Sequence, residues 1–404
     1  MKGNMRTSDI LFPEVEKVNR QNLMELKMKL QKTKRKESWM MCLGAGVSIS
    51  VGLPNWHKLL AIITAQIFPI IGEKEMLDSI NSKAYYKGIK QFYKDLTYEN
   101  KFLEKYEDSF KGKYTKTFEN INMLEAAEYI LNYLKGDLEY SSEDASRNGG
   151  DFQKRVYFHM NYLIQQACKF EGKVDISNPI FENTTLAAVA RLMKTEKDDL
   201  IHNVITYNYD NLLEEYLRNI CKCDSKCVHS IVKKDELRDF GNKKEWNIYH
   251  VHGRVPVVPH SGEDMSDNII LTESDYYQEE QINYSWTNIL QSYAMLRSNL
   301  IFIGFSGADY NFRRLIKYVN QENAMPHERY IFFAVDDIAR AVFNEGKDVN
   351  DCVNEMEKKG SEYSFEKLFI NYLIHAQTVY WEKHGMKVIW SSHKELYDDL
   401  EKLH

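Results

Sequence analysis

The stretch CLGAGVSISVGLPNW, which runs from Cys42 to Trp56, places three glycines and two serines behind a short apolar segment. The apolar run at residues 39–43 is typical of a buried strand, and the apolar residues 59–63 beyond the stretch indicate a helix. Glycine lets the backbone approach a ligand closely, and the N-terminus of a helix attracts an anion. This turn from strand to helix therefore favours nucleotide binding, with a tight structural turn as the alternative.

Two common nucleotide-binding loops do not match this stretch. It lacks the lysine and hydroxyl of a Walker loop, and the spacing of Gly44, Gly46 and Gly52 is not that of a dehydrogenase fingerprint. The loop therefore needs support from the rest of the chain.

The composition indicates a large globular protein. The chain has 404 residues, of which 43% are hydrophobic, which is ample for a large core. A net charge of −6 gives no electrostatic reason to expect direct contact with nucleic acid or a membrane surface. Residues 1–35 are charged throughout and no apolar stretch is long enough to span a membrane, so we expect a cytoplasmic protein.

Strand-like and helix-like segments alternate along most of the chain. Residues 14–36 carry apolar positions at steps of three and four, which predicts an amphipathic helix with a basic end. The segment 61–197 is mostly helical in pattern. The strand-like runs are 39–43, 202–206, 247–251, 268–271, 299–303, 330–335 and 386–390, and helix-like stretches such as 211–221 and 310–320 separate several of them.

Short apolar strands that alternate with helices predict a doubly wound, mainly parallel α/β sheet of Rossmann-like type. The last strand and a helix at 394–403 continue the same pattern. We expect an N-terminal helical arm at residues 1–36 and one catalytic domain at 37–404, which contains a large helical insertion at about 61–197.

Polar residues follow several of the predicted strands, at the edge where ligands bind in such sheets. The glycine loop follows the first strand and Thr206-Tyr-Asn-Tyr-Asp210 the second. His252-Gly253 follows the strand at 247–251, and Gly304-Phe-Ser-Gly-Ala-Asp309 follows the strand at 299–303.

This ordered set resembles the sirtuin family, and more closely the bacterial sirtuin-like NAD hydrolases. The stretch GAGVS…GLP is similar to the family's GAGxS…GIP loop, TYNYD to its TQNID, HVHG to its catalytic HG, and GFS to its GTS. The resemblance extends from about residue 37 to residue 390, interrupted by the helical insertion. It implies that NAD⁺ is the substrate and assigns roles to individual residues.

The implied roles divide along the dinucleotide. The residues that the resemblance places at the pyrophosphate and nearby ribose are Gly44, Ala45, Gly46 and Ser48. Ser306, with Gly304, would lie against the adenosine half.

Three further residues would act at the nicotinamide end. Asn208 would orient the nicotinamide ribose or a water molecule, Asp210 would bind the carboxamide, and His252 would be the general base. Cleavage of the N-glycosidic bond releases neutral nicotinamide, so one base near neutrality suffices, and an unperturbed imidazole suits that task.

Each of these polar residues also has a structural interpretation. Asn208 fits a turn, Asp210 fits the N-cap of the helix that follows, and a His before Gly is common in turns. Asp309 and Asn311 would likewise cap the helix after the GFS turn.

The sequence departs from the deacylase pattern at two places. A sirtuin deacylase carries a zinc ribbon of two C-x-x-C pairs between its HG and GTS motifs, whereas residues 253–304 contain no cysteine. Pro54-Asn55-Trp56-His57 replaces the family's P-D-F-R, which removes its arginine. Zinc remains an open alternative at Cys221, Cys223, Cys227 and His229, but we expect no metal.

We therefore expect an enzyme that hydrolyses NAD⁺ to nicotinamide and ADP-ribose, similar to effectors that deplete NAD⁺ in bacterial anti-phage defence. Protein deacylation or ADP-ribosylation is the enzymatic alternative, and a non-catalytic NAD⁺ or ADP-ribose sensor is the other. An enzyme that drains NAD⁺ needs control, so we expect a homo-oligomer. The resembling systems add a HerA-type ATPase as a possible partner.

Overall fold

The computed structural model describes residues 6–32, 39–53, 127–128, 169–170, 173–174, 181–194, 201–239, 244–256, 269–281, 285–322, 327–343 and 365–403. The chain divides into two compact units, one of residues 1–53, 164–259 and 282–404 and the other of residues 54–163 and 260–281. Most described residues belong to the first unit. The domain boundaries predicted from the sequence stay predictions.

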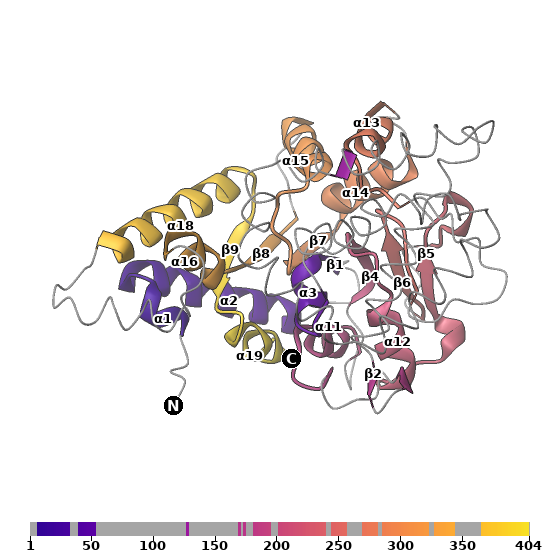
Figure 1. Cartoon of the computed structure of the whole chain (residues 1–404), viewed down its shortest axis with the longest axis horizontal. Helices are drawn as coiled ribbons and strands as arrows, with labels where there is room; N and C mark the ends of the chain where they lie inside the picture. Colours follow the sequence, from indigo (N-terminus) through magenta and orange to yellow (C-terminus); the bar gives the residue numbers. More distant parts are fainter. Residues whose placement is uncertain are drawn as a thin grey trace, which may run out of the picture. The chain divides into compact units, whose positions relative to one another are not determined.

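The first unit is built on a seven-stranded sheet in which each pair of neighbouring strands is parallel. Its strands are β1 (Trp39–Leu43), β4 (Ile201–Thr206), β5 (Val228–Ile231), β6 (Trp246–His250), β7 (Asn299–Ile303), β8 (Arg329–Ala334) and β9 (Lys387–Ser391). The order across the sheet is β5-β6-β4-β1-β7-β8-β9 (Figure 1). This order confirms the predicted doubly wound α/β fold.

The order across the sheet also locates the place where a ligand is expected. The chain adds β4, β5 and β6 on one side of β1 and then returns to add β7, β8 and β9 on the other. The strand order therefore reverses at the β1–β7 pair, whose carboxyl ends are Leu43 and Ile303. Open α/β sheets bind ligands in the crevice at such a switch point.

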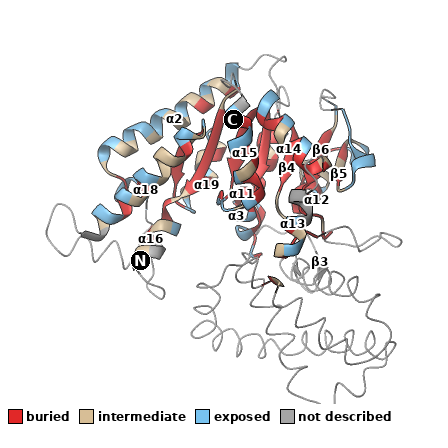
Figure 2. Cartoon of the chain, turned by 90° about the horizontal axis from the view of Figure 1, so that it is seen from above, coloured by how far each residue is buried: buried red, intermediate tan, exposed pale blue. Residues whose placement is uncertain are grey.

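Both faces of the sheet are covered, which explains why its strands are apolar runs rather than alternating patterns. Every residue of β1, β4, β6 and β7 is buried, and Figure 2 shows the strands buried beneath helices whose outer sides are exposed. Met40 and Cys42 of β1 belong to the core cluster that includes residues of α14, α15 and α18. Since neighbouring strand residues point to opposite faces, Met41 and Leu43 face the other layer.

The helices form two groups by their contacts. One group is α3 (Ala45–Ile49), α11 (Thr185–Met193), α12 (Leu212–Asn219) and α19 (Glu395–Glu401), in which α11 contacts the other three and β4. The other group is α14 (Trp286–Arg297), α15 (Tyr310–Glu322), α16 (Val335–Phe343) and α18 (Phe365–Lys383), in which α14 packs on β7 and α18 on β9. Two short 3₁₀ turns, η3 (Ser225–Cys227) and η4 (Lys234–Glu236), flank β5.

The N-terminal helices lie along the last strand of the sheet. These are α1 (Thr7–Ile10) and α2 (Pro13–Lys32), and α2 contacts β9 (Figure 1). Asn19 donates to the backbone oxygen of Trp390 (2.7 Å) and accepts from its N–H (2.6 Å), while Asn22 donates to Val388 O (2.9 Å). The side chains thus bind backbone groups that an edge strand would otherwise present to a neighbouring chain. The predicted helix at 14–36 is confirmed as far as Lys32, and residues 33–36 lie outside the described residues.

Two predictions about strands were wrong. The described residues 269–271 of the predicted strand at 268–271 form no strand; instead the N–H groups of Leu271 and Thr272 donate to Asp275 as α13 (Glu273–Gln281) begins. The sequence pattern also missed β5, which begins directly after Cys227.

The segment predicted as a helical insertion is described only in part. The helix expected at 59–63 and most of 61–197 lie outside the described residues. Within that segment, α11 is helical, whereas β2 (Lys169–Phe170) and β3 (Lys173–Val174) form a short antiparallel pair. Among the helices that the structure describes, none is long and apolar enough to cross a membrane.

Candidate active site

The loops that follow β1 and β7 touch each other through their backbones. The N–H groups of Gly44 and Gly46 donate to the backbone oxygens of Ile303 (3.0 Å) and Gly304 (2.9 Å). A Cβ atom on Gly46 would lie 2.7 Å from the Cα of Gly304, and one on Gly44 would lie 2.5 Å from its oxygen. Gly304 itself has a φ of 62°, which other residues rarely adopt. The glycines at this switch point are therefore required for the two loops to approach.

This geometry changes what the glycine loop contributes. The N–H groups of Gly44 and Gly46 are occupied within the protein, so they are not presented to a phosphate. Ala45 is exposed and Ser48 is buried behind it. The pyrophosphate role expected for Gly44, Ala45, Gly46 and Ser48 stays a prediction. The Ser48 side chain bonds to two other predicted site residues, Asn208 and Asp210.

Ser48, Asn208 and Asp210 form one chain of hydrogen bonds at the carboxyl end of the sheet. The Asn208 amide nitrogen donates to the Gly44 oxygen (3.0 Å) and to Ser48 Oγ (3.0 Å). Ser48 Oγ in turn donates to Asp210 Oδ2 at 2.6 Å. Ser48 thus bonds to two residues that lie 160 and 162 positions away in the sequence.

The same bonds fix the orientation of the Asn208 amide. A backbone oxygen can only accept, so the nitrogen of the amide must face Gly44. Asn208 Oδ1 makes no hydrogen bond within the described part of the chain and remains able to accept one from a hydroxyl group or a water molecule. Asn208 is one of the residues that line a small pocket: Leu43, Val47, Ser48, Leu186, Thr206, Asn208, Asp210, Leu213, Glu214 and Ile248.

Asp210 divides its two carboxylate oxygens between structure and site. Oδ1 accepts from the N–H of Leu212 (3.2 Å), the first residue of α12, but the N-cap position is Asn211, so the predicted N-cap role of Asp210 was wrong by one residue. Oδ2 accepts from Ser48, as described above. Burial raises the pKa of Asp210 above its ordinary value, and the bonds from Ser48 and Leu212 oppose that rise only in part.

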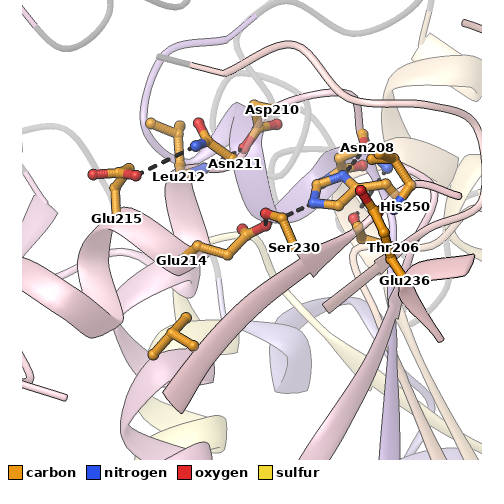
Figure 3. A network of polar contacts seen from close by, with 12 residues as sticks. Thr206, Asn208, Asp210, Asn211, Leu212, Glu214, Glu215, Ser230, Glu236 and His250 are labelled. Carbon is orange, nitrogen blue, oxygen red and sulfur yellow. Dashed lines mark hydrogen bonds and ion pairs between the residues drawn. The ribbon is translucent and has the colours of Figure 1, made fainter. Parts of the chain in front are cut away.

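A second polar group lies beside Asn208 and was not predicted from the sequence. His250 Nε2 lies 2.7 Å from Glu214 Oε1, and the same carboxylate oxygen accepts from Ser230 Oγ (Figure 3). The other ring nitrogen of His250, Nδ1, lies 3.4 Å from the backbone oxygen of Asn208. The side chains of His250 and Glu214 are 0% and 1% exposed, so this is a buried histidine–carboxylate pair.

His252 lies in a different group of contacts. Its Nε2 is 3.4 Å from Asp309 Oδ2, and its ring meets the edge of Tyr207 with 5.3 Å between ring centroids. Tyr207 also packs against Phe305 and donates its hydroxyl hydrogen to Gln291 (2.7 Å). The next residue, Gly253, has a φ of 84°, so glycine allows the chain to turn directly after His252.

The two groups flank the end of β4. Tyr207 packs on the aromatic residues after β7, whereas its neighbour Asn208 bonds to the loop after β1. Adjacent residues at the end of an extended strand point in opposite directions, which accounts for this division. His252 therefore contacts Tyr207, the sequence neighbour of Asn208. The hydrogen bonds that link Ser48, Asn208 and Asp210 do not include it.

Asp309 and Asn311 have structural partners. Asp309 Oδ1 accepts from the Phe312 N–H (2.6 Å) in the first turn of α15, which confirms the predicted cap. The Asn311 amide donates to Asn288 of α14 at 2.7 Å. Asp309 therefore both begins α15 and faces His252. Ser306 is exposed and accepts from the Ala308 N–H (3.2 Å), and its adenosine role stays a prediction.

The cysteine cluster does not form a metal centre among the residues that the structure describes. There, no group of three His, Cys, Asp or Glu side chains is arranged to hold a metal ion. Cys221, Cys223 and Cys227 are free thiols, and burial raises the pKa of Cys221 to about 11. His229 Nε2 instead lies 3.5 Å from Glu245 Oε2.

Part of the chain matches a known family. Residues 202–360 match the model of the SIR2-like domain, which supports a sirtuin-like family. SIR2-like domains are typically NAD-dependent enzymes, so the match supports an NAD-related activity. The matched segment contains Asn208, Asp210, His252 and the turn after β7, but not the glycine loop. No curated protein matches the chain.

Proposed function

We propose that this protein is an NAD⁺ glycohydrolase that cleaves NAD⁺ to nicotinamide and ADP-ribose. The observation that carries the proposal is the fixed Asn208 amide, whose nitrogen is held by Gly44 and Ser48 and whose oxygen is left to accept from a substrate hydroxyl or a water molecule. The amide bonds to the loop after β1, one of the two strands at the switch point of the sheet, and lies in the segment that matches the SIR2-like domain.

The chemistry requires little acid catalysis. Nicotinamide leaves as a neutral molecule while positive charge develops on the ribose. Asp210, held by Ser48, supplies a carboxyl group at the nicotinamide end, and the Asn208 oxygen orients the attacking water or the ribose hydroxyl. His252 accepts the proton that this nucleophile releases, and Asp309 stabilises the resulting imidazolium.

Water is the proposed acceptor. The cysteines that would build a zinc ribbon between the HG and GTS motifs are absent from residues 253–304, so the platform that a deacylase offers to an acyl-lysine peptide has no counterpart in that interval. This supports hydrolysis over transfer to a peptide.

The test is incubation of the purified chain with NAD⁺ and chromatography of the products. We expect nicotinamide and ADP-ribose in equal amounts. His252→Ala and Asn208→Ala are expected to reduce turnover by roughly 10²-fold or more, as loss of a general base or of a positioned nucleophile does. Asp224→Asn, an exposed cap of η3, serves as the matched control that keeps full turnover.

The other outcomes discriminate between the alternatives. Nicotinamide release that needs an acetylated peptide identifies a deacylase, and ADP-ribose found on protein identifies a transferase. Tight binding of NAD⁺ without turnover by the wild type identifies a sensor. Turnover at the wild-type rate by a folded His252→Ala protein removes the mechanism given above.

The biological role extends the same proposal. Depletion of NAD⁺ fits an effector of anti-phage defence that acts by abortive infection, held inactive in a homo-oligomer or with a HerA-type ATPase. The support for this role is the motif resemblance alone. Measuring molecular mass and NAD⁺ turnover of the chain, by itself and with the product of a neighbouring gene, tests it. A monomer whose activity no partner changes contradicts the regulatory part.

A further inference from the structure

The buried pair of His250 and Glu214 has no role in the reaction proposed above, yet it touches the segment that carries Asn208. Figure 3 shows Ser230 and Glu214 on one side of His250, which lies beside Thr206 and Asn208. The three side chains come from β5, α12 and β6, so the network joins two strands and the helix that follows the segment. None of the three is needed to complete the sheet, whose strands pair through their backbones.

The hydrogen bonds indicate what each group of the pair does. The Asn208 backbone oxygen can only accept, so His250 Nδ1 must carry a hydrogen to bind it. Burial acts to raise the pKa of Glu214, but the facing His250 and the hydrogen bond from Ser230 together outweigh it, and the pKa lies below its ordinary value. The Glu214 carboxylate lies 2.7 Å from Nε2 on the other side of the ring. His250 thus bridges Glu214 and the backbone of Asn208.

We propose that His250 and Glu214 are positioning residues for Asn208, with His250 donating from Nδ1 to the Asn208 backbone oxygen while Glu214, itself bonded to Ser230, holds the other side of the ring. The backbone of residue 208 is then fixed on two sides. Its N–H donates to Thr206 Oγ1 (3.1 Å), and its oxygen accepts from His250. The side-chain amide is fixed separately by Gly44 and Ser48.

A merely structural role makes a different prediction. If the pair only satisfied buried polar groups, the bond between Nε2 and Glu214 would matter and the longer contact to Asn208 would not. The two ring nitrogens can be replaced one at a time. The amide nitrogen of Asn occupies about the position of His Nδ1, and that of Gln about the position of Nε2. His250→Asn therefore keeps the donor to Asn208, and His250→Gln keeps the donor to Glu214.

The experiment compares amide hydrogen exchange of the full-length wild type, His250→Asn and His250→Gln in a peptide that covers residues 206–212. This segment contains the hydrogen-bonded amides of Tyr207, Asn208 and Leu212. We expect exchange to rise about tenfold in His250→Gln, the effect of one lost hydrogen bond, and to stay near the wild type in His250→Asn. The matched controls are His202→Asn and His202→Gln, since His202 is a buried histidine of β4 whose Nδ1 faces the Glu245 backbone oxygen (3.2 Å).

Turnover is the second readout, and it alone rests on the proposed function. Because Asn208 is proposed to act in the chemical step, kcat in His250→Gln should fall about tenfold with KM for NAD⁺ within about twofold, and His250→Asn should restore most of it. A wild type that releases no nicotinamide overturns the proposed function, while the exchange data still decide the positioning role.

Two results overturn the inference. One is exchange in 206–212 that stays at the wild-type rate in His250→Gln. The other is an equal rise in both His250 variants, which assigns the histidine a structural role only. If both variants lose protection throughout the sheet, Ser230→Ala takes their place, because it removes only the outer donor to Glu214. Faster exchange confined to 206–212 then supports the inference, and an unchanged rate overturns it.

Discussion

Replacement of Asp309 by asparagine separates the two tasks of this side chain. One carboxylate oxygen caps α15 by accepting from the Phe312 N–H (2.6 Å), and the other lies 3.4 Å from His252 Nε2. Asparagine caps helices about as well as aspartate, so the first bond is kept. It has no charge, so the second interaction is lost. Asp309→Ala loses both.

The expected loss follows from the distance. In the proposed reaction His252 gains a positive charge as it accepts a proton. Two unit charges 3.4 Å apart interact by about 5 kcal/mol at an effective dielectric constant of about 20. With about half of the proton transferred in the transition state, the carboxylate contributes about 2.5 kcal/mol. That corresponds to a rate about 70-fold lower in Asp309→Asn.

The assay is nicotinamide release at saturating NAD⁺, with thermal melting of the same samples. Asp309→Asn should keep its melting temperature within about 2 °C while its kcat falls, and Asp309→Ala should in addition lose about 1 kcal/mol of unfolding free energy with the cap. Asp224→Asn, which replaces an exposed cap of η3, should change neither quantity. A kcat of Asp309→Asn within about threefold of the wild type, at unchanged stability, would refute an electrostatic role of the carboxylate.

Three further predictions concern the fold and metal content. Gly46→Ala should lower the free energy of unfolding by about 1–3 kcal/mol in urea, because its Cβ would lie 2.7 Å from the Gly304 Cα; unchanged stability would show that the two loops can separate at no cost. Asn19→Ala should cost about 2–3 kcal/mol, since both backbone groups of Trp390 lose their partner, and a cost below about 0.5 kcal/mol would contradict the edge-covering role. A chelator should leave turnover and melting temperature unchanged, whereas stoichiometric zinc in the purified chain would contradict the expectation of a metal-free enzyme.

Much of the sheet could be predicted because its strands are buried on both faces. A strand such as Asn299–Ile303 must be apolar throughout, and short apolar runs separated by helical patterns mark each one. Apolar runs mispredict strands in two cases: a segment can be buried without forming a strand, and a strand can form without being apolar throughout. Residues 269–271 are buried and apolar but precede α13, whereas β5 has two half-buried residues in its middle and gives no apolar run.

Of the candidate site, the sequence could predict only the residues that follow the end of a predicted strand. Asn208 and Asp210 follow a strand end, and parallel strands bring their carboxyl ends to one edge, so their meeting with Ser48 is a consequence of topology. His250 and Glu214 could not be paired in this way. In the sequence, His250 belongs to a strand-like run and Glu214 to the polar face of a predicted helix. Only the packing of α12 on the sheet brings His250 Nε2 within 2.7 Å of Glu214 Oε1.

The N-terminal arm shows how a correct prediction of secondary structure can still suggest a wrong experiment. The apolar spacing of α2 predicts a helix, and a helix not needed for the site invites deletion as a test of partner binding. Asn19 and Asn22, however, occupy polar positions whose carboxamides bind the backbone of β9 much as another strand would. Deleting residues 1–36 would expose that edge, and an exposed edge promotes self-association by itself. A changed mass after deletion would therefore say nothing about a natural partner. Substitutions on the outward face of α2, where Met24 is 64% exposed, leave the edge covered and test partner binding without that ambiguity.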